Sequence, residues 1–372
     1  MTLKKIGVVS YNIYSNFTNY GSALQSWAMN RKINQLGYYA MLVDYCPTIL
    51  KDKDPLNPIK NMWDQDEVSR KMCELSMPAI EKNYYKFDRF YHEQFNRTNK
   101  YTADNFNEII RKEKIDGFVC GSDTIFCIDE FGFDDGYYAN YECMKKNTVS
   151  YAASFGDSHF DDESYAILNN RLRNFNALGL RENQMVPYVK SVTDVKVQRT
   201  IDPTLLLTNK DYDTIIADKL VNEKYLLLYV RRYNPQMEAY AEQLAGKHGW
   251  KIVEISLRAT NADKENRIMF YEAGVEEFLS LVKHAEYVVT NSYHGMIFAV
   301  QYRRCFNVFS REQCDTKIIE LLELLGLSDR LIKCTNEADI DTVIDYDSVH
   351  KRLESARKQS LEFLSLELEK YL

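Results

Sequence analysis

The sequence predicts an α/β protein that is built from two doubly wound domains, and three observations support this expectation. Short apolar runs of strand length alternate with segments whose apolar residues recur at the spacing of a helix face. This alternation restarts after residue 223 with four strand–helix units in succession. The length of 372 residues, at roughly 150 residues per domain, favours two domains.

In the first half, helix faces and helix ends define the expected elements. The first helix, 21–36, has apolar residues at helical spacing and stops at Gly37. Thr102 is expected to cap a helix that runs to Lys114. Acidic residues begin a further helix at 161–173, where the helix dipole favours them. The expected strands are 5–10, 39–45, 116–120, 148–154 and 177–181, and the segment 195–207 completes this half.

The second half repeats one pattern, in which an apolar strand is followed by an amphipathic helix. The expected strands are 225–230, 251–255, 287–290 and 304–309. The expected helices are 235–248, 275–284, 295–302 and 316–325. A last helix, 348–371, has no strand after it, so we expect it to pack back on the first domain.

These elements divide the chain into an N-terminal domain, 1–210, and a C-terminal domain, 211–345, with the final helix in 346–372. The segment near 46–100 differs from the rest because it is rich in proline, charged and aromatic residues. We expect a loop followed by helices here, the last one around 80–95. This insertion would cover the first sheet or line a cleft.

Composition and charge exclude several classes of protein. The chain has 47 Lys and Arg against 54 Asp and Glu, a net charge of −7, which gives no broad attraction to nucleic acid or anionic lipid. No run of 18 apolar residues occurs, and we expect no transmembrane helix. The 8 cysteines contain no CxxC pair, and the 6 histidines show no spacing that would join them in a metal site. We therefore expect a cytoplasmic protein without a bound metal.

Candidate functional residues lie where a strand gives way to a helix, because open α/β sheets bind ligands beyond the carboxyl ends of their strands. The first such junction contains Asn19, Tyr20, Gly21 and Ser22. Free backbone N–H groups at Gly21 and Ser22 would bind an anion at the helix N-terminus. A plain N-cap and turn would use the same residues.

The second junction is Gly121-Ser122-Asp123, which follows the strand 116–120. Glycine permits a close approach to the backbone, and Asp123 could accept a proton or hold a sugar hydroxyl. The same residues also suit a β-turn with a capping aspartate. The local pattern leaves both interpretations open.

The third junction contains Asn291, Ser292, His294 and Gly295, directly after the strand 287–290. A histidine near the positive end of a helix dipole is favoured in its neutral, proton-accepting form. A structural histidine that caps a turn is the alternative.

Three arginines end strands on the side where the junctions lie. Arg181 closes the strand 177–181, and Arg231 and Arg232 follow the first strand of the second half. The planar guanidinium group can bind a phosphate or a carboxylate through two parallel hydrogen bonds. A salt bridge or a solvated face is the structural alternative for each arginine.

Seven short motifs follow one another along the chain. They are Asn19-Tyr20-Gly21-Ser22-Ala23-Leu24-Gln25, Val119-Cys120-Gly121-Ser122-Asp123, Ser150-Tyr151-Ala152-Ala153-Ser154-Phe155-Gly156, Leu180-Arg181-Glu182, Ile201-Asp202-Pro203-Thr204-Leu205-Leu206, Thr290-Asn291-Ser292-Tyr293-His294-Gly295 and Leu324-Leu325-Gly326-Leu327. Together and in this order they resemble the polysaccharide pyruvyl transferase family. The resemblance spans about residues 5–333, and neither the segment 46–100 nor the last helix takes part in it.

The resemblance implies a GT-B-like fold, in which two Rossmann-like domains face each other across a cleft. It also implies transfer of a pyruvyl group from phosphoenolpyruvate to a hydroxyl pair of a sugar. The acceptor would be a cell-surface polysaccharide or its lipid-linked oligosaccharide precursor, and no further cofactor is implied.

The resemblance also implies roles for two residues, because His294 matches the characteristic histidine of the family and Arg181 matches a donor-binding arginine. From its place on a strand-to-helix loop we expect His294 to act as general acid or base, and Asp123 is our candidate for activating the acceptor hydroxyl. The expected donor-binding residues are Arg181, Asn291, Ser292, Gly295, Arg231 and Arg232. The expected cleft and acceptor residues are Asn19, Tyr20, Gly21, Ser22, Gly121 and Ser122.

One position departs from the family pattern. Some branches have an arginine two residues before the histidine, where this chain has Ser292. Either Arg231 or Arg232 supplies the missing charge, or the donor differs from phosphoenolpyruvate. A GT-B-like glycosyltransferase that uses a nucleotide sugar, or a non-catalytic glycan-binding protein, would have the same fold.

A lipid-linked acceptor would bring the protein to the inner face of the membrane as a peripheral protein. The sequence indicates neither the acceptor sugar nor the oligomeric state.

Overall fold

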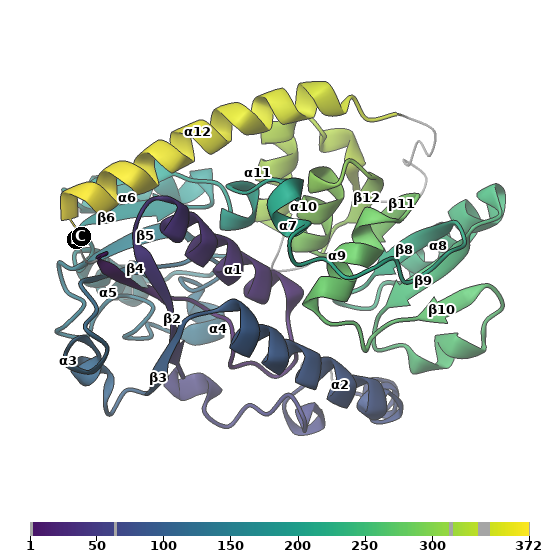
Figure 1. The fold of residues 1–372 in the computed structure, drawn as a ribbon, viewed down its shortest axis with the longest axis horizontal. Coiled ribbons are helices and arrows are strands. Elements are labelled where there is room, and N and C mark those ends of the chain that lie inside the picture. Colours follow the sequence, from purple (N-terminus) through teal and green to yellow (C-terminus); the bar gives the residue numbers. More distant parts are fainter. Residues whose placement is uncertain (1–2, 63–64, 312–314, 334–342, 372) are drawn as a thin grey trace.

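The structure, a computed structural model, contains two parallel β-sheets with helices packed around them (Figure 1). It describes residues 3–62, 65–311, 315–333 and 343–371. In both sheets the strand order runs outward in two directions from a central pair, β1 and β4 in the first sheet and β8 and β11 in the second. This is the doubly wound arrangement, so the predicted α/β fold is confirmed.

The first sheet has the strand order β3-β2-β1-β4-β5-β6-β7. Its strands are β1 (Lys5–Val9), β2 (Tyr39–Tyr45), β3 (Arg97–Tyr101), β4 (Gly117–Cys120), β5 (Thr148–Ala153), β6 (Ala177–Leu180) and β7 (Lys196–Arg199). Every residue of β4, β5 and β6 is buried. This is the pattern of a parallel sheet that is covered on both faces.

The second sheet has the order β10-β9-β8-β11-β12-β13. Its strands are β8 (Tyr225–Tyr229), β9 (Lys251–Ile255), β10 (Arg267–Met269), β11 (Tyr287–Thr290), β12 (Cys305–Phe309) and β13 (Leu331–Ile332). The last strand of the first sheet therefore ends at Arg199 and the first strand of the second begins at Tyr225. The domain boundaries at 210 and 345 stay predictions.

Helices lie between these strands in the sequence, and a last helix follows them. They are α1 (Tyr20–Gln35), α2 (Glu67–Gln94), α3 (Ile109–Glu113), α4 (Ile128–Phe131), α5 (Asp162–Leu172), α6 (Val186–Val192), α7 (Asn209–Tyr212), α8 (Pro235–His248), α9 (Val275–Lys283), α10 (Tyr293–Gln301), α11 (Asp315–Leu325) and α12 (Tyr346–Tyr371). No helix in the described part of the chain is both long and apolar enough to cross a bilayer.

The segment after β2 differs from its prediction. The expected helix at 80–95 is the second half of α2, which begins at Glu67 and continues through Pro78. Asp66 caps this helix by accepting a hydrogen bond from the Ser69 backbone N–H. Proline has no backbone N–H and so removes one helical hydrogen bond, yet α2 continues on both sides of Pro78.

The prediction of a helix from Thr102 to Lys114 is wrong about where the helix begins. The side chain of Asn105 accepts a hydrogen bond from the Thr102 backbone N–H, so a turn forms where the cap was predicted. A 3₁₀ turn at Phe106–Glu108 then leads into the short helix α3.

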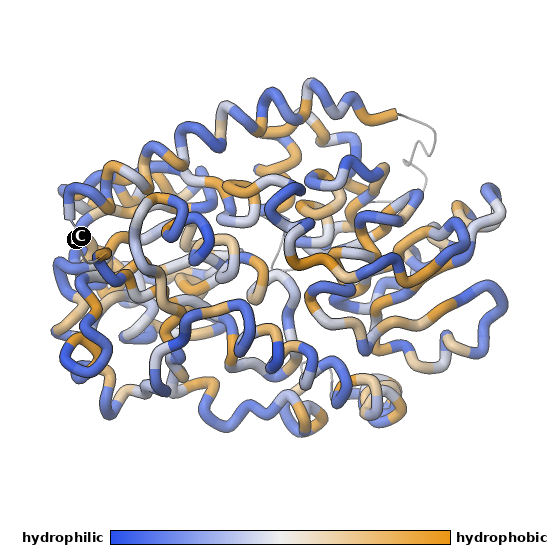
Figure 2. The backbone as a smooth tube through the Cα atoms, in the orientation of Figure 1, coloured by the Kyte–Doolittle hydropathy of each residue, from blue (hydrophilic) through white to orange (hydrophobic). Residues whose placement is uncertain are grey.

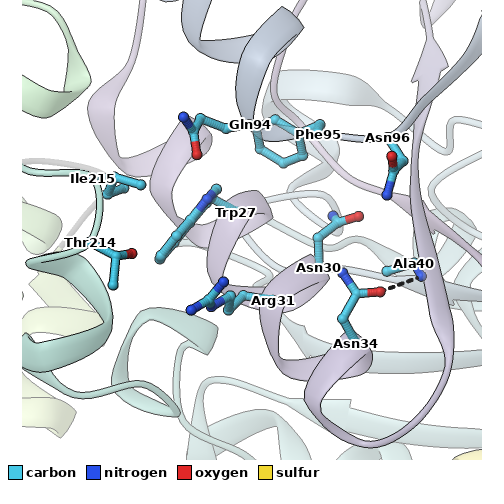
Figure 3. A pocket seen from close by; sticks show the side chains of 10 residues that line it. All are labelled: Trp27, Asn30, Arg31, Asn34, Ala40, Gln94, Phe95, Asn96, Thr214 and Ile215. Carbon is cyan, nitrogen blue, oxygen red and sulfur yellow. Dashed lines mark hydrogen bonds between the residues drawn. The ribbon is translucent and has the colours of Figure 1, made fainter.

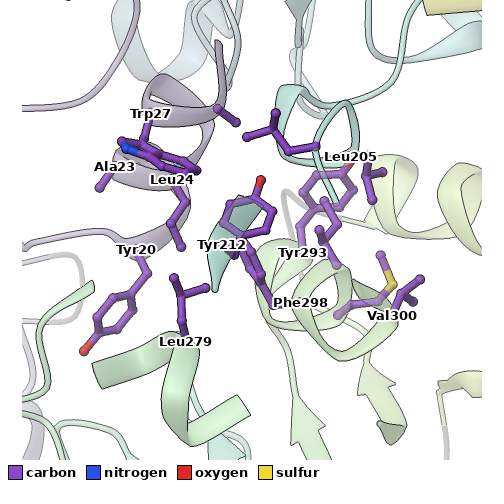
Figure 4. Packing of buried hydrophobic residues seen from close by; sticks show 14 of the residues in the cluster. Tyr20, Ala23, Leu24, Trp27, Leu205, Tyr212, Leu279, Tyr293, Phe298 and Val300 are labelled. Atoms are coloured by element: carbon purple, nitrogen blue, oxygen red, sulfur yellow. The ribbon is translucent and has the colours of Figure 1, made fainter. Parts of the chain in front are cut away.

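A single apolar cluster joins the two sheets. The Tyr20 ring at the start of α1 stacks on Phe278 of α9, with ring centroids 4.5 Å apart. Trp27 of α1 contacts Tyr212, which in turn packs edge-on against Phe298 of α10. Figure 4 shows Tyr20, Trp27, Tyr212 and Phe298 in this cluster, between elements of the two halves. The two halves therefore share one hydrophobic core.

The last helix crosses from the second sheet to the first. Its beginning lies on the second half, where His350 contacts the carbonyl of Val300. Further along, Ser360 Oγ accepts a hydrogen bond from the Ile201 backbone N–H, and Phe363 packs over Gly179 of β6. Hydrophilic and hydrophobic stretches alternate along this helix in Figure 2, as expected for a helix with one buried face.

Candidate functional site

The N-terminus of α1 is closed by its own cap. The Asn19 side chain accepts hydrogen bonds from the backbone N–H groups of Gly21, at 3.0 Å, and Ser22, at 3.4 Å. The expectation that these two N–H groups are free to bind an anion is therefore wrong. An asparagine at this position satisfies the first orphan donors of the helix itself.

Gly21 touches the imidazole of His294 across the boundary between the two halves. A Cβ at residue 21 would lie 2.6 Å from Cγ of His294 and would overlap its Nδ1. Only glycine leaves the room that this contact needs. The first and third sequence junctions thus meet in space, although 273 residues separate them (294 − 21).

The second junction joins the same cluster through Asp123. Ser22 Oγ donates a hydrogen bond to Asp123 Oδ2 at 2.7 Å, and Asp123 Oδ1 accepts one from the Thr124 backbone N–H at 2.9 Å. Asp123 is buried and has a φ of 71°, a left-handed conformation that aspartate tolerates. Its carboxylate is thereby fixed beside the start of α1.

Gly121 has a φ of 124°, and a side chain there would overlap the carbonyl oxygen of Tyr151 in β5. The close approach that this glycine permits is thus to the neighbouring strand. Gln25 holds the next residue, because its Oε1 accepts a hydrogen bond from the Ser122 backbone N–H at 3.0 Å.

A series of buried polar side chains in contact connects His294 to the first sheet. His294 Nε2 lies 3.3 Å from Asp202 Oδ2, and that same oxygen lies 2.9 Å from Nη2 of Arg181. Arg181 Nη2 also donates a hydrogen bond to Ser122 Oγ. The imidazole is therefore oriented by a carboxylate that is itself paired with a guanidinium group.

Asp202 is fully buried and ionised in this arrangement. Burial by itself would raise the pKa of Asp202, but the Arg181 guanidinium and His294 outweigh burial and hold that pKa below its ordinary value. The other carboxylate oxygen accepts hydrogen bonds from the backbone N–H and the hydroxyl of Thr204, at 2.9 and 2.6 Å. Asp202 lies within one of the seven motifs but was not among the predicted site residues.

Arg181 is enclosed, which bears on its expected role in binding the donor. Its side chain is 3% exposed, and its guanidinium group lies 5.2 Å from the centroid of the Tyr293 ring. The cavity beside it, also lined by Arg199 and Lys317, has a volume of about 10 Å³, which is room for one water. Nε and Nη1 of Arg181 have no hydrogen-bond partner in the described part of the chain. In this state Arg181 positions Asp202, and donor binding by Arg181 stays a prediction.

The third junction begins α10 at Tyr293, two residues earlier than expected. Ser292 caps the helix by accepting a hydrogen bond from the Gly295 backbone N–H at 3.2 Å, and Gly295 packs against Thr290. Among the described residues, nothing accepts a hydrogen bond from the backbone N–H groups of Tyr293 and His294. The anion site expected here is thus reduced to these two donors.

Asn291 holds the loop that follows β8. Its Oδ1 accepts a hydrogen bond from the Arg231 backbone N–H at 2.8 Å, and its Nδ2 donates to the Arg232 carbonyl at 2.6 Å. Each end of the side-chain amide makes one hydrogen bond, so Asn291 positions the loop. The amide keeps a second N–H group and a second lone pair, and donor binding by Asn291 stays a prediction.

The Arg231 side chain is exposed and reaches across to the first half, where Nη1 donates to the Thr18 carbonyl at 3.4 Å. Tyr11 lies nearby. Burial raises the pKa of Tyr11, and the charges that act on it come from Glu130 and Asp123 of the first half and from Arg231. Charged groups of both halves therefore gather where the carboxyl ends of the central strands meet.

The structure thus brings Gly21, Ser22, Ser122, Asp123, Arg181 and His294 together in one cluster. Tyr20 points away from it, because its hydroxyl donates to the Ala273 carbonyl at 2.7 Å and so ties α1 to the second half. Across the described ranges, no group of three His, Cys, Asp or Glu side chains is placed to hold a metal ion.

Comparison with solved structures identifies the fold. A putative UDP-N-acetylglucosamine 2-epimerase from Listeria monocytogenes is 10% identical and has a TM-score of 0.53, with 98% of this chain and 91% of that one covered. An S. aureus MnaA–UDP co-structure is 13% identical with a TM-score of 0.52, and 97% and 91% of the two chains are covered. A further UDP-N-acetylglucosamine 2-epimerase is 11% identical with a TM-score of 0.50 over 98% and 96% of the chains. These are GT-B enzymes, so the GT-B-like fold is confirmed.

Sequence comparison gives the family. No curated protein matches the chain. The family model described as polysaccharide pyruvyl transferase matches residues 19–313, a range that includes Asn19, Asp123, Arg181, Asp202 and His294. The chain therefore belongs to the polysaccharide pyruvyl transferase family.

Proposed function

We propose that the protein transfers the pyruvyl group of phosphoenolpyruvate to two hydroxyls of one sugar and so forms a cyclic ketal. The acceptor is a cell-surface polysaccharide or its lipid-linked precursor. Family membership over residues 19–313 supports a transferase. The observation that carries the proposal is the joined cluster, in which His294, held by Asp202, lies against Gly21 and the next residue, Ser22, binds Asp123.

The reaction requires two proton transfers. The methylene carbon of phosphoenolpyruvate gains a proton, and C2 forms bonds to two sugar oxygens while its bond to the phosphate oxygen breaks. The two hydroxyls lose one proton each: one balances the new methyl group and the other leaves on inorganic phosphate. A group that gives and takes protons near neutral pH is therefore needed close to C2.

His294 is our candidate for this group. Asp202 Oδ2 lies 3.3 Å from Nε2 and fixes the plane of the imidazole ring. Nδ1 lies against α1 at Gly21, where the absent side chain leaves space. Asp123 is the candidate for taking the proton of the acceptor hydroxyl, since its carboxylate is fixed by Ser22 and Thr124.

The donor carries a phosphate and a carboxylate, which both need cationic or N–H partners. The free backbone N–H groups of Tyr293 and His294 and the exposed Arg231 supply them in our proposal. Arg231 then takes the place of the arginine that other branches have where this chain has Ser292. A lipid-linked acceptor would bring the protein to the inner face of the membrane.

The proposal is tested by phosphate release and by donor affinity. Calorimetry should show binding of phosphoenolpyruvate, and addition of a sugar acceptor with two free hydroxyls that one ketal can bridge should release phosphate from phosphoenolpyruvate. His294→Gln should lower turnover by about 10²–10⁴-fold, the usual contribution of a general acid or base, while its thermal melt stays close to that of the wild type. Binding of a nucleotide sugar without any response to phosphoenolpyruvate would instead make the protein a glycosyltransferase. Glycan binding without turnover of either donor would make it a binding protein.

A further inference from the structure

A second site lies beside the middle of α1, apart from the His294 cluster. It is a cavity of about 380 Å³. Its walls come from α1 and from the start of β2 (Figure 3). They are completed by the end of α2 with the two residues that follow it, Phe95 and Asn96, and by Thr214 and Ile215 after α7. At about 1.5 Å per residue along a helix, Asn30 lies about 14 Å from Gly21 along the axis of α1, so the two sites are distinct.

One face of α1 supplies most of the functional groups of the cavity. Trp27, Asn30, Arg31 and Asn34 line it and follow one another at the spacing i, i+3, i+4 and i+7, which places them on one side of the helix. Figure 3 shows their side chains around the same space, opposite Phe95 and Ile215. An aromatic ring, two amides and a guanidinium group therefore face one cavity.

Asn30 has a hydrogen-bond acceptor that the described residues leave unused. Its side chain is 95% buried, since the residue is 5% exposed, and Nδ2 donates to the Ser26 carbonyl at 3.0 Å. Oδ1 is buried and has no partner in the described part of the chain. A buried acceptor without a partner costs about 1–3 kcal/mol, and a hydroxyl group of a ligand in the cavity would supply the missing donor.

The charge of the cavity is positive. Arg31 lies over the Trp27 ring, with its guanidinium carbon 5.9 Å from the centroid. No carboxylate in the described ranges forms an ion pair with Arg31, and no aspartate or glutamate lines the cavity. An anionic group would therefore gain more here than a neutral one.

We propose that this cavity binds a sugar unit that carries a carboxylate. Its volume lies within the range of small-molecule sites, about 300–1,000 Å³. The rings of Trp27 and Phe95 would contact the C–H face of the sugar, the amides of Asn30 and Asn34 its hydroxyls, and Arg31 its carboxylate. The carboxylate could belong to a uronic acid or to a sugar that already bears a pyruvyl ketal, and only the second source rests on the proposed function.

The test uses four probes and ligand-observed NMR titrations: methyl glucuronide, a methyl glucoside with a 4,6-pyruvyl ketal, neutral methyl glucoside, and acetate. We expect at least one acidic sugar to bind tenfold or more tightly than the neutral glucoside and than acetate. Arg31→Ala should abolish this preference. Arg111→Ala, which removes an exposed arginine of α3 outside the cavity, should keep it.

A second variant tests the cavity itself. Asn30→Leu removes the buried acceptor and should abolish binding of each acidic sugar that the wild type binds. A thermal melt shows that the fold is kept. Equal binding of neutral and acidic sugars, equal binding of acetate, or a preference that survives Arg31→Ala would overturn the proposal. Phosphate release from phosphoenolpyruvate with a small sugar acceptor should be unchanged in Arg31→Ala, because the cavity lies apart from His294. Failure of this proposal and failure of the proposed reaction are therefore distinguishable.

Discussion

Gly21 is the residue whose replacement tests the geometry of the cluster most directly. A methyl group at this position would lie 2.6 Å from Cγ of His294, so the imidazole must move away from Asp202 or α1 must shift. We expect Gly21→Ala to lose most of the turnover and about 1–3 kcal/mol of unfolding free energy, as overpacked sites do. Phosphate release and urea unfolding measure the two effects.

A matched control exists in α8. Gly246 has no atom within 4 Å of the position that a Cβ would take, so Gly246→Ala should keep full turnover and gain up to about 1 kcal/mol from helix propensity. If Gly21→Ala behaves in the same way as this control, the contact between α1 and His294 is not needed for the reaction.

Asp202 should control how stability depends on pH. Its pKa in the folded protein lies below that of an unfolded aspartate, about 3.9, because Arg181 and His294 favour the carboxylate over the effect of burial. Asp202 therefore stabilises the fold above about pH 4, and this contribution is lost as the pH falls further toward the lowered pKa.

Asp202→Asn should remove this contribution and cost about 3–5 kcal/mol at pH 7, because Arg181 becomes a buried charge without a counter-ion. Urea unfolding between pH 3 and pH 7 measures both effects. Glu142→Gln, at an exposed side chain, is the control and should leave the curve unchanged. A variant with the wild-type pH profile would show that Asp202 and Arg181 do not act as a pair.

The residues of the cluster could be predicted only in part. Strand ends followed by glycine and polar residues indicated all three junctions, because the carboxyl ends of parallel strands share one edge. The partner of each side chain could not be predicted, since Asp202 and His294 lie 92 residues apart and meet only through the packing of the two sheets. The free N–H groups expected at Gly21 and Ser22 were wrong because Asn19 satisfies them locally.

At the scale of elements, α12 should contribute to the stability of the first sheet. Phe363 of this helix is buried against Gly179 of β6. We expect Phe363→Ala to cost about 3–5 kcal/mol of unfolding free energy, the usual loss for a buried phenylalanine. Leu366 on the same helix is 47% exposed, so Leu366→Ala should change stability by no more than about 0.5 kcal/mol. Equal losses in the two variants would mean that α12 does not cover the sheet.

The elements that were predicted within a residue or two have strong periodicity and clear ends. The helix α8 begins at Pro235 and ends before Gly249, as its sequence indicates. The strands β3, β10 and β13 were not predicted. The sequence of β3 is polar and lies at a sheet edge, while β10 and β13 have three and two residues. Such strands form because a neighbouring strand offers hydrogen bonds, and this is not visible in the local pattern.

At the scale of the whole molecule, a large apolar interface joins the two halves. The helix α1 is buried on nearly all sides, because it packs on its own sheet and against α9 and α10. The insertion adds to this interface, since Lys86 of α2 forms an ion pair with Glu277 of α9 at 2.6 Å. Two domains were predicted from length and pattern, but their shared core was not, because the pattern of one helix does not tell which of its faces meets a distant element.

Because α12 packs on the first sheet but follows both sheets in the sequence, the first sheet cannot be fully covered until this helix has been synthesised. Ser360, which holds the Ile201 backbone, leaves the ribosome 159 residues later than its partner. At about 5–20 residues per second, the face of β5 and β6 that α12 covers stays bare for on the order of ten seconds. The whole second sheet is made during that interval. The nascent N-terminal half therefore exposes an apolar surface to chaperones until α12 emerges, and the arrival of this helix is the step that buries it.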